Sequence, residues 1–288
     1  MFSNRLYSPL RYPGGKARFA PFIGQLMRAN GLDDGHYLEP YAGGAGVALD
    51  LLFSEIAAHV HINDFDPAVA AFWTAATEHS GQLLELLDRT PVTMDEWYRW
   101  RGVLQEPEAV SPAEAGFATL FLNRTNRSGI LKGGVIGGRG QMGTYKLDAR
   151  FNKQALRSRL ERIAANSSRI SVHCVDARLL LKEAHQFLPL KALVYLDPPY
   201  FVKGQELYRN FYSESDHLVL AKLLQSNRFR RPWVVSYDDA PEIREMYVAC
   251  PGFDYDLYYS AQSKYRGAEL MRFRTGMVIP PFSLGKAA

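Results

Sequence analysis

The tetrapeptide Asp197-Pro198-Pro199-Tyr200 carries the strongest chemical signal in the sequence. It follows an apolar run, residues 193–196, that is typical of a buried strand. Proline lacks a backbone N–H, so only carbonyl oxygens and the Asp197 carboxylate remain as polar groups at this strand end. Such a corner can accept both protons of an aromatic amino group while Tyr200 stacks on the ring. The alternative is a strand-ending turn with a capping aspartate and a buried tyrosine.

This arrangement matters because an aromatic amine is a poor nucleophile while its lone pair is delocalised into the ring. If the Asp197 carboxylate and the Pro198 carbonyl each accept one amino proton, the N–H bonds are held out of the ring plane. Asp197 can also disperse the positive charge that develops on nitrogen. The four residues therefore predict methylation of an exocyclic amine.

A second candidate site is the segment Leu38-Glu39-Pro40-Tyr41-Ala42-Gly43-Gly44-Ala45-Gly46. Its glycines permit a tight turn and close approach of a ligand. The third glycine of the dinucleotide fingerprint is missing, and no phosphate-loop Lys-Ser or Lys-Thr follows Gly46. A cationic, phosphate-free adenosyl ligand fits better, with Glu39 at its ammonium or sulfonium side. A glycine turn that serves only strand–helix packing is the alternative.

Three further polar residues adjoin predicted elements in a way that suits ligand binding. Asp64 ends a strand at a place where acidic residues of nucleotide folds accept ribose hydroxyls. Asp176 either contacts an adenine amino group or caps the following helix. Lys16 closes Tyr12-Pro13-Gly14-Gly15-Lys16 at a helix start, where a carboxylate or phosphate can bind; a plain turn is the alternative.

Short β-rich runs alternate with helical patterns, which predicts an α/β fold with a mostly parallel sheet. The predicted strands are 37–39, 59–63, 170–175, 193–196 and 233–237. The predicted helices are 16–28, 47–57, 67–78, 153–165, 214–226 and 240–248. Residues 253–259 and 270–278, joined by a loop at 260–267, indicate an antiparallel closing pair.

The alternation stops between about residues 73 and 165, where helical segments, prolines and a glycine-rich stretch replace it. We therefore expect a catalytic domain of residues 1–72 and 166–288 and an inserted, mainly helical domain of residues 73–165.

Positive charge is concentrated in this insertion. Residues 117–162 hold ten lysines and arginines against two acidic residues, a local charge of +8, so the rest of the +4 chain carries −4. One basic segment on a mildly acidic body is typical of a face that meets a polyanion, although a solvated basic loop would give the same pattern.

Taken in order, the Tyr12 to Lys16 and Glu39 to Gly46 motifs, Asn63-Asp64 and Asp197 to Tyr200 resemble the Dam-type DNA adenine-specific (N-6) methyltransferases. The resemblance implies a Rossmann-like methyltransferase sheet, S-adenosylmethionine as cofactor and methylation of adenine N6 in double-stranded DNA. It implies that Asp197, Pro198 and Tyr200 hold the adenine. The cofactor residues that it implies are Tyr12, Lys16, Tyr41, Ala42, Gly43, Gly44, Asp64 and Asp176. Tyr41 replaces the phenylalanine that is commoner in the family.

The insertion resembles the family's target-recognition domain in Phe121-Leu122-Asn123-Arg124 and Asn126-Arg127-Ser128-Gly129. We expect Arg124 or Arg127 to read guanine in the major groove while basic side chains hold phosphates. The predicted DNA-binding residues are Asn123, Arg124, Asn126, Arg127, Lys132 and Arg139. Residues 133–143 do not resemble the family's GATC-reading hairpin, so no recognition sequence is predicted.

An amino nitrogen inside a base pair is inaccessible to in-line methyl transfer, so the adenine must be flipped out of the duplex. The segment 201–212, with Tyr208, Phe211 and Tyr212, either closes over the flipped base or is an ordinary surface loop.

Other activities remain open on sequence grounds. The amino group of cytosine or an adenine of RNA would suit the same corner, and the basic segment would serve RNA equally well. A protein glutamine is less favoured because glutamine methyltransferases typically carry Asn where Asp197 stands. A non-catalytic DNA-binding protein of this fold would not need the acceptor corner.

Bulk properties add the cellular context. Two cysteines, Cys174 and Cys250, are too few for a disulfide framework and suit a reducing compartment. The first residues lack a signal core, and no run approaches the ~18 apolar residues that span a bilayer. We expect a cytoplasmic bacterial, archaeal or phage protein that needs no metal and acts as a monomer, with a restriction endonuclease as a conceivable partner.

Overall fold

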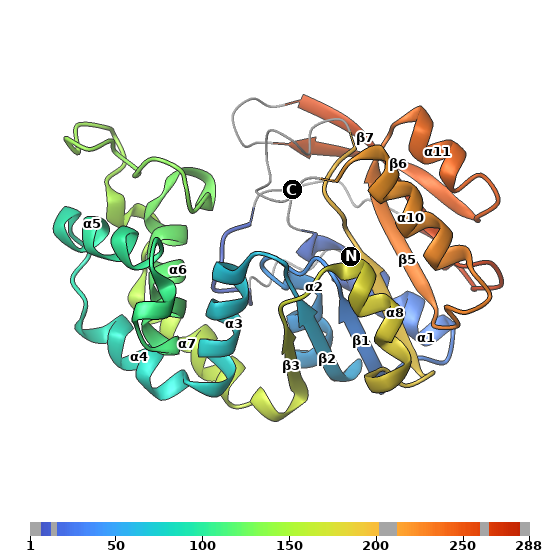
Figure 1. Cartoon of the computed structure of the whole chain (residues 1–288), viewed down its shortest axis with the longest axis horizontal. Coiled ribbons are helices and arrows are strands. Elements are labelled where there is room, and N and C mark those ends of the chain that lie inside the picture. Colours follow the sequence, from blue (N-terminus) through green and yellow to red (C-terminus); the bar gives the residue numbers. More distant parts are fainter. Residues whose placement is uncertain (1–6, 13–15, 202–211, 260–264, 283–288) are drawn as a thin grey trace. The chain divides into compact units, whose positions relative to one another are not determined.

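The computed structural model describes residues 7–12, 16–201, 212–259 and 265–282. These residues form two compact units, which Figure 1 colours along the chain. The first unit holds residues 16–66 and 173–288, and the second holds residues 7–15 and 67–172.

A seven-stranded sheet has the strand order β3-β2-β1-β4-β5-β7-β6. β1 pairs in parallel with β2 and β4, and β4 pairs in parallel with β5. β7 pairs antiparallel with both β5 and β6. The strands are β1 (Gly35–Glu39), β2 (Ala57–Asn63), β3 (Ile170–His173), β4 (Ala192–Leu196), β5 (Trp233–Asp238), β6 (Gly252–Tyr259) and β7 (Tyr265–Phe273). The predicted α/β class, with a mostly parallel sheet and an antiparallel closing pair, is confirmed.

Two elements differ clearly from their predicted bounds for local reasons. The last strand begins at Tyr265, inside the predicted loop, and ends at Phe273 instead of residue 278, before a turn in which Gly276 has a φ of +90°. The helix predicted at 47–57 ends at Phe53. Glu55 then adopts a left-handed φ of +54°, and Ala57 already starts β2.

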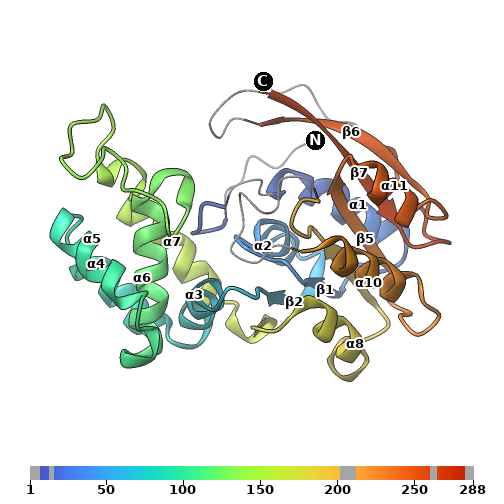
Figure 2. The ribbon, with the colours of Figure 1, turned by 45° about the horizontal axis from the view of Figure 1, so that its top comes forward.

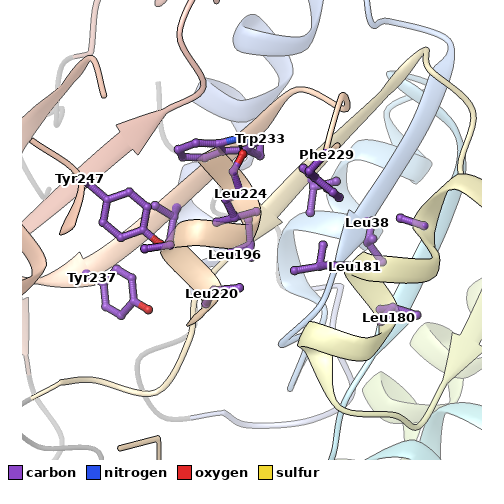
Figure 3. Packing of buried hydrophobic residues seen from close by; sticks show 14 of the residues in the cluster. Leu38, Leu180, Leu181, Leu196, Leu220, Leu224, Phe229, Trp233, Tyr237 and Tyr247 are labelled. Carbon is purple, nitrogen blue, oxygen red and sulfur yellow. Dashed lines mark hydrogen bonds between the residues drawn. The ribbon is translucent and has the colours of Figure 1, made fainter. Parts of the chain in front are cut away.

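Helices of the first unit cover both faces of the sheet. They are α1 (Ala20–Ala29), α2 (Gly46–Phe53), α8 (Ala177–Phe187), α10 (Glu214–Gln225) and α11 (Pro241–Met246), with a 3₁₀ turn at Ala17–Phe19. Side chains of α8, α10 and α11 bury one apolar cluster against β1, β4 and β5 (Figure 3). Within it, the indole of Trp233 donates to the Leu224 carbonyl at 2.9 Å. Every residue of β4 is buried, as expected for a central parallel strand.

The strand order reverses between β1 and β4. β2 and β3 extend the sheet on one side of β1, while β5 and its antiparallel partners extend it beyond β4. The loops that leave the carboxyl ends of β1 and β4 therefore diverge, and open α/β sheets bind ligands in the crevice at such a point. Both chemical motifs of the sequence follow these two strands.

The second unit is mainly helical. It holds α3 (Pro67–Glu78), α4 (Ser80–Arg89), α5 (Met94–Val103), α6 (Pro112–Thr125) and α7 (Lys153–Ala164), which Figure 2 shows as one group, and 3₁₀ turns at Pro107–Ala109, Arg127–Gly129, Leu147–Arg150 and Ser167–Arg169. A capping box between Ser111 and Glu114 starts α6. Gly116 lets α6 approach α3 closely, since a Cβ there would lie 2.3 Å from that of Ala75. This packing places all of α3 in the second unit, so this part of the unit begins at Pro67 and not at the predicted residue 73.

Four histidines form a row across β1, β2 and the end of β3. Nδ1 of His36 lies 3.0 Å from Nε2 of His61, and Nδ1 of His61 lies 3.4 Å from Nε2 of His173. The ring of His59 stacks on that of His36 at 5.0 Å. Burial, with the neighbouring histidines, lowers the pKa of His61 to about 3. Burial also lowers the pKa of His36 and His173, so these two and His61 are neutral at physiological pH.

Two features are absent from the described residues. None of their helices is both long and apolar enough to cross a membrane. Their His, Cys, Asp and Glu side chains form no group of three or more that could hold a metal ion.

Candidate active site

The loop after β1 is shaped by two left-handed residues. Gly43 has a φ of +47° and Ala45 a φ of +46°, and the amide of Ala45 donates to the Ala42 carbonyl at 2.6 Å. Glycine is the residue that tolerates this conformation at least cost. Gly46 is needed for a different reason, since a Cβ there would lie 2.7 Å from that of Ala17. Ala42, Gly43 and Gly44 are buried in this turn.

Asp64 holds this loop from the end of β2. Its Oδ2 accepts from the amide of Gly43 at 2.9 Å, and its Oδ1 accepts from the amide of Asp66 at 2.9 Å. Burial raises the pKa of Asp64 to about 6. A carboxylate oxygen can accept more than one hydrogen bond, so both oxygens retain capacity for hydroxyl donors.

Asn63 fastens three strand ends to one another. Its side-chain amide donates to the carbonyls of Pro40 at 2.8 Å and Val175 at 3.0 Å. Its Oδ1 accepts from the amide of Val175 at 3.1 Å. Asn63 is fully buried, so these bonds fix the rim of the crevice without facing a ligand.

Glu39 turns toward helix α2. Its Oε1 accepts from the Tyr37 hydroxyl at 2.9 Å and from the amide of Ala48 at 3.0 Å. Burial raises the pKa of Glu39 to about 8, so the carboxyl is mostly protonated at neutral pH. A cation at Oε2 would reverse this shift, because a nearby positive charge favours the ionised form.

Asp197 presents one oxygen of its carboxylate to its neighbours. Its Oδ1 accepts from Ser236 Oγ at 2.7 Å and lies 3.6 Å from Lys16 Nζ. No partner of Oδ2 is found among the described residues, and 26% of the side chain remains exposed. Burial raises the pKa of Asp197 to about 6, against the opposing effect of Lys16. Asp197 is therefore ionised at pH 7 and has an acceptor to offer.

A buried network supports this corner. Lys16 Nζ donates to both oxygens of Glu269, at 2.8 and 2.9 Å. Glu269 also accepts from the hydroxyls of Tyr200 at 2.9 Å and Tyr255 at 2.6 Å. Tyr200, 7% exposed, is thereby anchored by its hydroxyl. These contacts do not support the prediction that Lys16 holds an anion of the ligand, because its ammonium is turned inward to carboxylates.

Three members of this network were missing from the sequence-based site. Glu269 and Tyr255 face each other across the β6–β7 ladder, and Ser236 lies on β5. A glutamate inside the otherwise apolar run 268–271 is the one sequence signal that could have pointed to them.

The remaining predicted cofactor residues differ in their contacts and in the unit to which they belong. Asp176 accepts from the amide of Arg178 at 2.8 Å and pairs with its guanidinium at 2.9 Å, so it caps α8. Tyr41 donates its hydroxyl to that of Tyr212 at 2.9 Å. Tyr12 is half-buried and belongs to the second unit. Residues 13–15 and 202–211, which include Tyr208 and Phe211, lie outside the described part of the chain.

Two asparagines predicted to contact DNA are structural in the second unit. Asn123, 3% exposed, accepts from the amide of Arg11 at 2.7 Å and donates to the carbonyls of Arg11 and Gly129 at 2.8 Å. Asn126, fully buried, accepts from the Trp97 indole at 2.7 Å. Their polar atoms are used inside the unit, which contradicts a role in base contacts.

Arg124 is also withdrawn from the surface. Its Nε donates to the Pro9 carbonyl at 2.5 Å, and Nη2 lies 3.5 Å from the Ser8 carbonyl. These contacts contradict the prediction that Arg124 reads guanine. Arg127, Lys132 and Arg139 are exposed instead.

The first unit thus combines an acceptor corner after β4 with a glycine loop and a second carboxylate after β1 and β2. The corner offers Asp197 Oδ2 and the backbone carbonyls of two prolines, beside an anchored aromatic ring. This set of groups can orient an amino group and bear a positive charge, and the crevice beside it can hold an adenosyl ligand.

Comparison with known protein families agrees with this chemistry. The family model described as D12 class N6 adenine-specific DNA methyltransferase matches residues 12–262. No curated protein matches the chain significantly in sequence.

The solved structures that match the chain are distant in sequence. The protein yhhF from Escherichia coli, named as a methyltransferase, is 12% identical with a TM-score of 0.39, covering 95% of this chain and 91% of that chain. The rRNA methyltransferase aviRa from Streptomyces viridochromogenes is 16% identical with a TM-score of 0.34, covering 91% of this chain and 86% of that chain.

Proposed function

Because the chain belongs to the D12 class N6 adenine-specific DNA methyltransferase family, we propose that it methylates N6 of an adenine flipped out of duplex DNA. S-adenosylmethionine supplies the methyl group when bound. The observation that carries the proposal is Asp197 Oδ2, which has no partner among the described residues, at a strand end where Pro198 and Pro199 provide no amide donor.

The residues of the corner divide the work. Asp197 Oδ2 and the Pro198 carbonyl each accept a hydrogen bond from the amino group, which makes the nitrogen lone pair available for in-line attack. The Tyr200 ring, fixed through its hydroxyl, stacks on the base. Asp197, ionised at pH 7, stabilises the positive charge on nitrogen before the proton leaves.

The cofactor residues are proposed from the crevice beside this corner. The turn 41–44 lies against the ligand's adenosyl part, and Asp64 accepts the ribose hydroxyls with its remaining lone pairs. Glu39 Oε2 faces the cationic side. The residues of the site accordingly fit the cofactor that the family requires.

The cellular setting follows from the family and from the sequence. We expect the protein to act as a cytoplasmic monomer on each DNA strand in turn. Co-expression with a restriction endonuclease of the same specificity would test whether methylation protects host DNA.

Substituting the catalytic carboxylate tests the mechanism. We expect Asp197→Ala to abolish methyl transfer to duplex DNA while S-adenosylmethionine binding, measured by calorimetry, stays detectable. Transfer by the unaltered enzyme should fall as pH drops through about 6, since protonated Asp197 no longer stabilises positive charge. Retained turnover in Asp197→Ala would refute the assigned role. Transfer to RNA or to cytosine alone would refute the substrate.

A further inference from the structure

The second unit contains a hollow lined by cations. Its volume is about 290 Å³, and four of its lining side chains are Arg101, Arg127, Lys132 and Arg139. The other lining residues are Trp97, Val135 and three glycines, so the lining contains no carboxylate. Such a set offers hydrogen-bond donors and positive charge but no side-chain acceptor.

The buried Asn126 fixes the shape of this hollow. Its Oδ1 accepts from Trp97 Nε1 on α5, and its Nδ2 donates to the carbonyls of Ile130 at 3.0 Å and Leu131 at 2.9 Å. The chain then returns, with the Arg127 amide donating to the Gly134 carbonyl at 2.9 Å. The segment that carries Arg127 and Lys132 is therefore hydrogen-bonded both to α5 and to the returning chain at Gly134.

Several other basic residues of the second unit have partners within it. Arg157 pairs with Asp88, Lys153 donates to the Asp88 carbonyl, and Arg159 donates to the Ser8 carbonyl. In contrast, within the described residues the side chains of Arg127, Lys132 and Arg139 form no ion pair. Three of the ten basic side chains of 117–162 thus line one hollow and are not neutralised there by a carboxylate.

Arg101 completes the set from a different part of the chain. It lies one helical turn after Trp97 on α5, and its guanidinium stands 5.0 Å from the centre of the Trp97 indole. This contact holds the long side chain toward the hollow. Four like charges around one small space repel one another, so the arrangement favours an anion among them.

We propose that this hollow binds one phosphodiester group of a DNA strand, an inference that rests on DNA being the substrate. A guanine edge presents two acceptors and is matched by a single guanidinium, whereas four converging cations suit the diffuse charge of a phosphate. Gly133, Gly134 and Gly138 leave the wall without side chains, which allows close approach of the DNA backbone. Arg127 is therefore assigned to phosphate and not to base reading.

A phosphate contact has a signature that base reading lacks. It strengthens binding to every duplex alike, and each neutralised phosphate contributes about 0.9 to the slope of log K against log salt concentration. If two cations share one phosphate, the effects of replacing each of them on this slope should therefore not add.

The experiment measures DNA binding at several salt concentrations for Lys132→Gln, Arg101→Gln and the double variant. Each is tested on a duplex whose sequence the wild type can methylate and on a duplex of scrambled sequence. We expect each single variant to lower the salt slope by up to about 1, the double variant by no more than about 1, and affinity to fall about three- to tenfold on both duplexes. Arg101 packs on Trp97, so Arg101→Gln could disturb the fold. Lys132 is exposed, so Lys132→Gln tests the site without this risk. The matched control is Arg99→Gln on the same helix, whose partner is Glu96 at 3.4 Å and which should leave the slope unchanged.

The outcomes separate this inference from the proposed function. An unchanged slope in both single variants, or a loss of affinity confined to the methylated duplex, would overturn the phosphate site while DNA methylation by the wild type stands. A lowered slope in an enzyme that binds but never methylates DNA would support the phosphate site and refute the proposed function.

Discussion

Replacing Glu269 by glutamine should weaken the fold and alter catalysis together. Lys16 and Glu269 are 4% and 1% exposed in their side chains, and their Nζ and Oε1 atoms are 2.8 Å apart. Removing one member of such a buried pair leaves the other charge uncompensated, which typically costs about 3–5 kcal/mol. Asp197, 3.6 Å from Lys16, offsets part of the loss, so we expect the free energy of unfolding to fall by about 3 kcal/mol.

The same change should shift the pH profile of methyl transfer. Glu269 raises the pKa of Asp197 by charge repulsion, so its removal lowers that pKa below about 6. The acid limb of the rate profile should then move to lower pH. A merely structural weakening would leave the limb where it is.

Urea denaturation followed by circular dichroism measures the stability effect. Glu85→Gln removes an exposed partner of Arg89 and should change stability by less than about 1 kcal/mol. Adding Lys16→Met to Glu269→Gln should restore part of the loss, because neither charge is then stranded. Equal unfolding of Glu269→Gln and Glu85→Gln would refute the reasoning.

Two further predictions concern buried titrating groups. Glu39→Gln should unfold at a higher temperature than the wild type near pH 8 but not near pH 4. The pKa of Glu39 is about 8 in the folded protein and 4.5 in the unfolded chain. The wild type therefore has its full stability below pH 4.5 and loses part of it as the pH rises to 8. The gain should be about 2 kcal/mol, and an unchanged melting temperature at pH 8 would argue against it. His61→Gln should make the free energy of unfolding less sensitive to acid. The pKa of His61 is about 3 in the folded protein and 6.5 in the unfolded chain, so the wild type loses stability as the pH falls below 6.5. Urea midpoints at pH 7 and 5 test this: the wild-type drop should exceed that of His61→Gln by about 2 kcal/mol, and equal drops would contradict it.

Local patterns were sufficient for the parts of the fold that short segments determine. An unbroken apolar run predicts β4, and the prolines after it predict where β4 ends. The order of helices and strands likewise predicts the parallel sheet. The Gly43 turn could be located because glycines cluster at a strand end, although its left-handed backbone needs the fold to specify it.

Partners that meet only through tertiary structure could not be predicted in this way. Glu269 reaches Lys16 because β7 pairs antiparallel with β5, and a one-residue change in that register would turn Glu269 to the other face. Asn123 is polar, so its sequence suits a DNA contact. Its burial against Arg11 depends on a segment far away in the chain.

The charged groups at the proposed base-binding corner do not cancel. The Lys16 ammonium faces two carboxylates, those of Glu269 and Asp197. A ligand with a sulfonium is therefore attracted to this corner, and a thioether of the same shape is not. Methyl transfer converts the first into the second, so the electrostatic attraction ends with the reaction itself. We expect this discharge to favour exchange of spent cofactor for fresh cofactor, and to make the difference in affinity between the two shrink in Asp197→Asn.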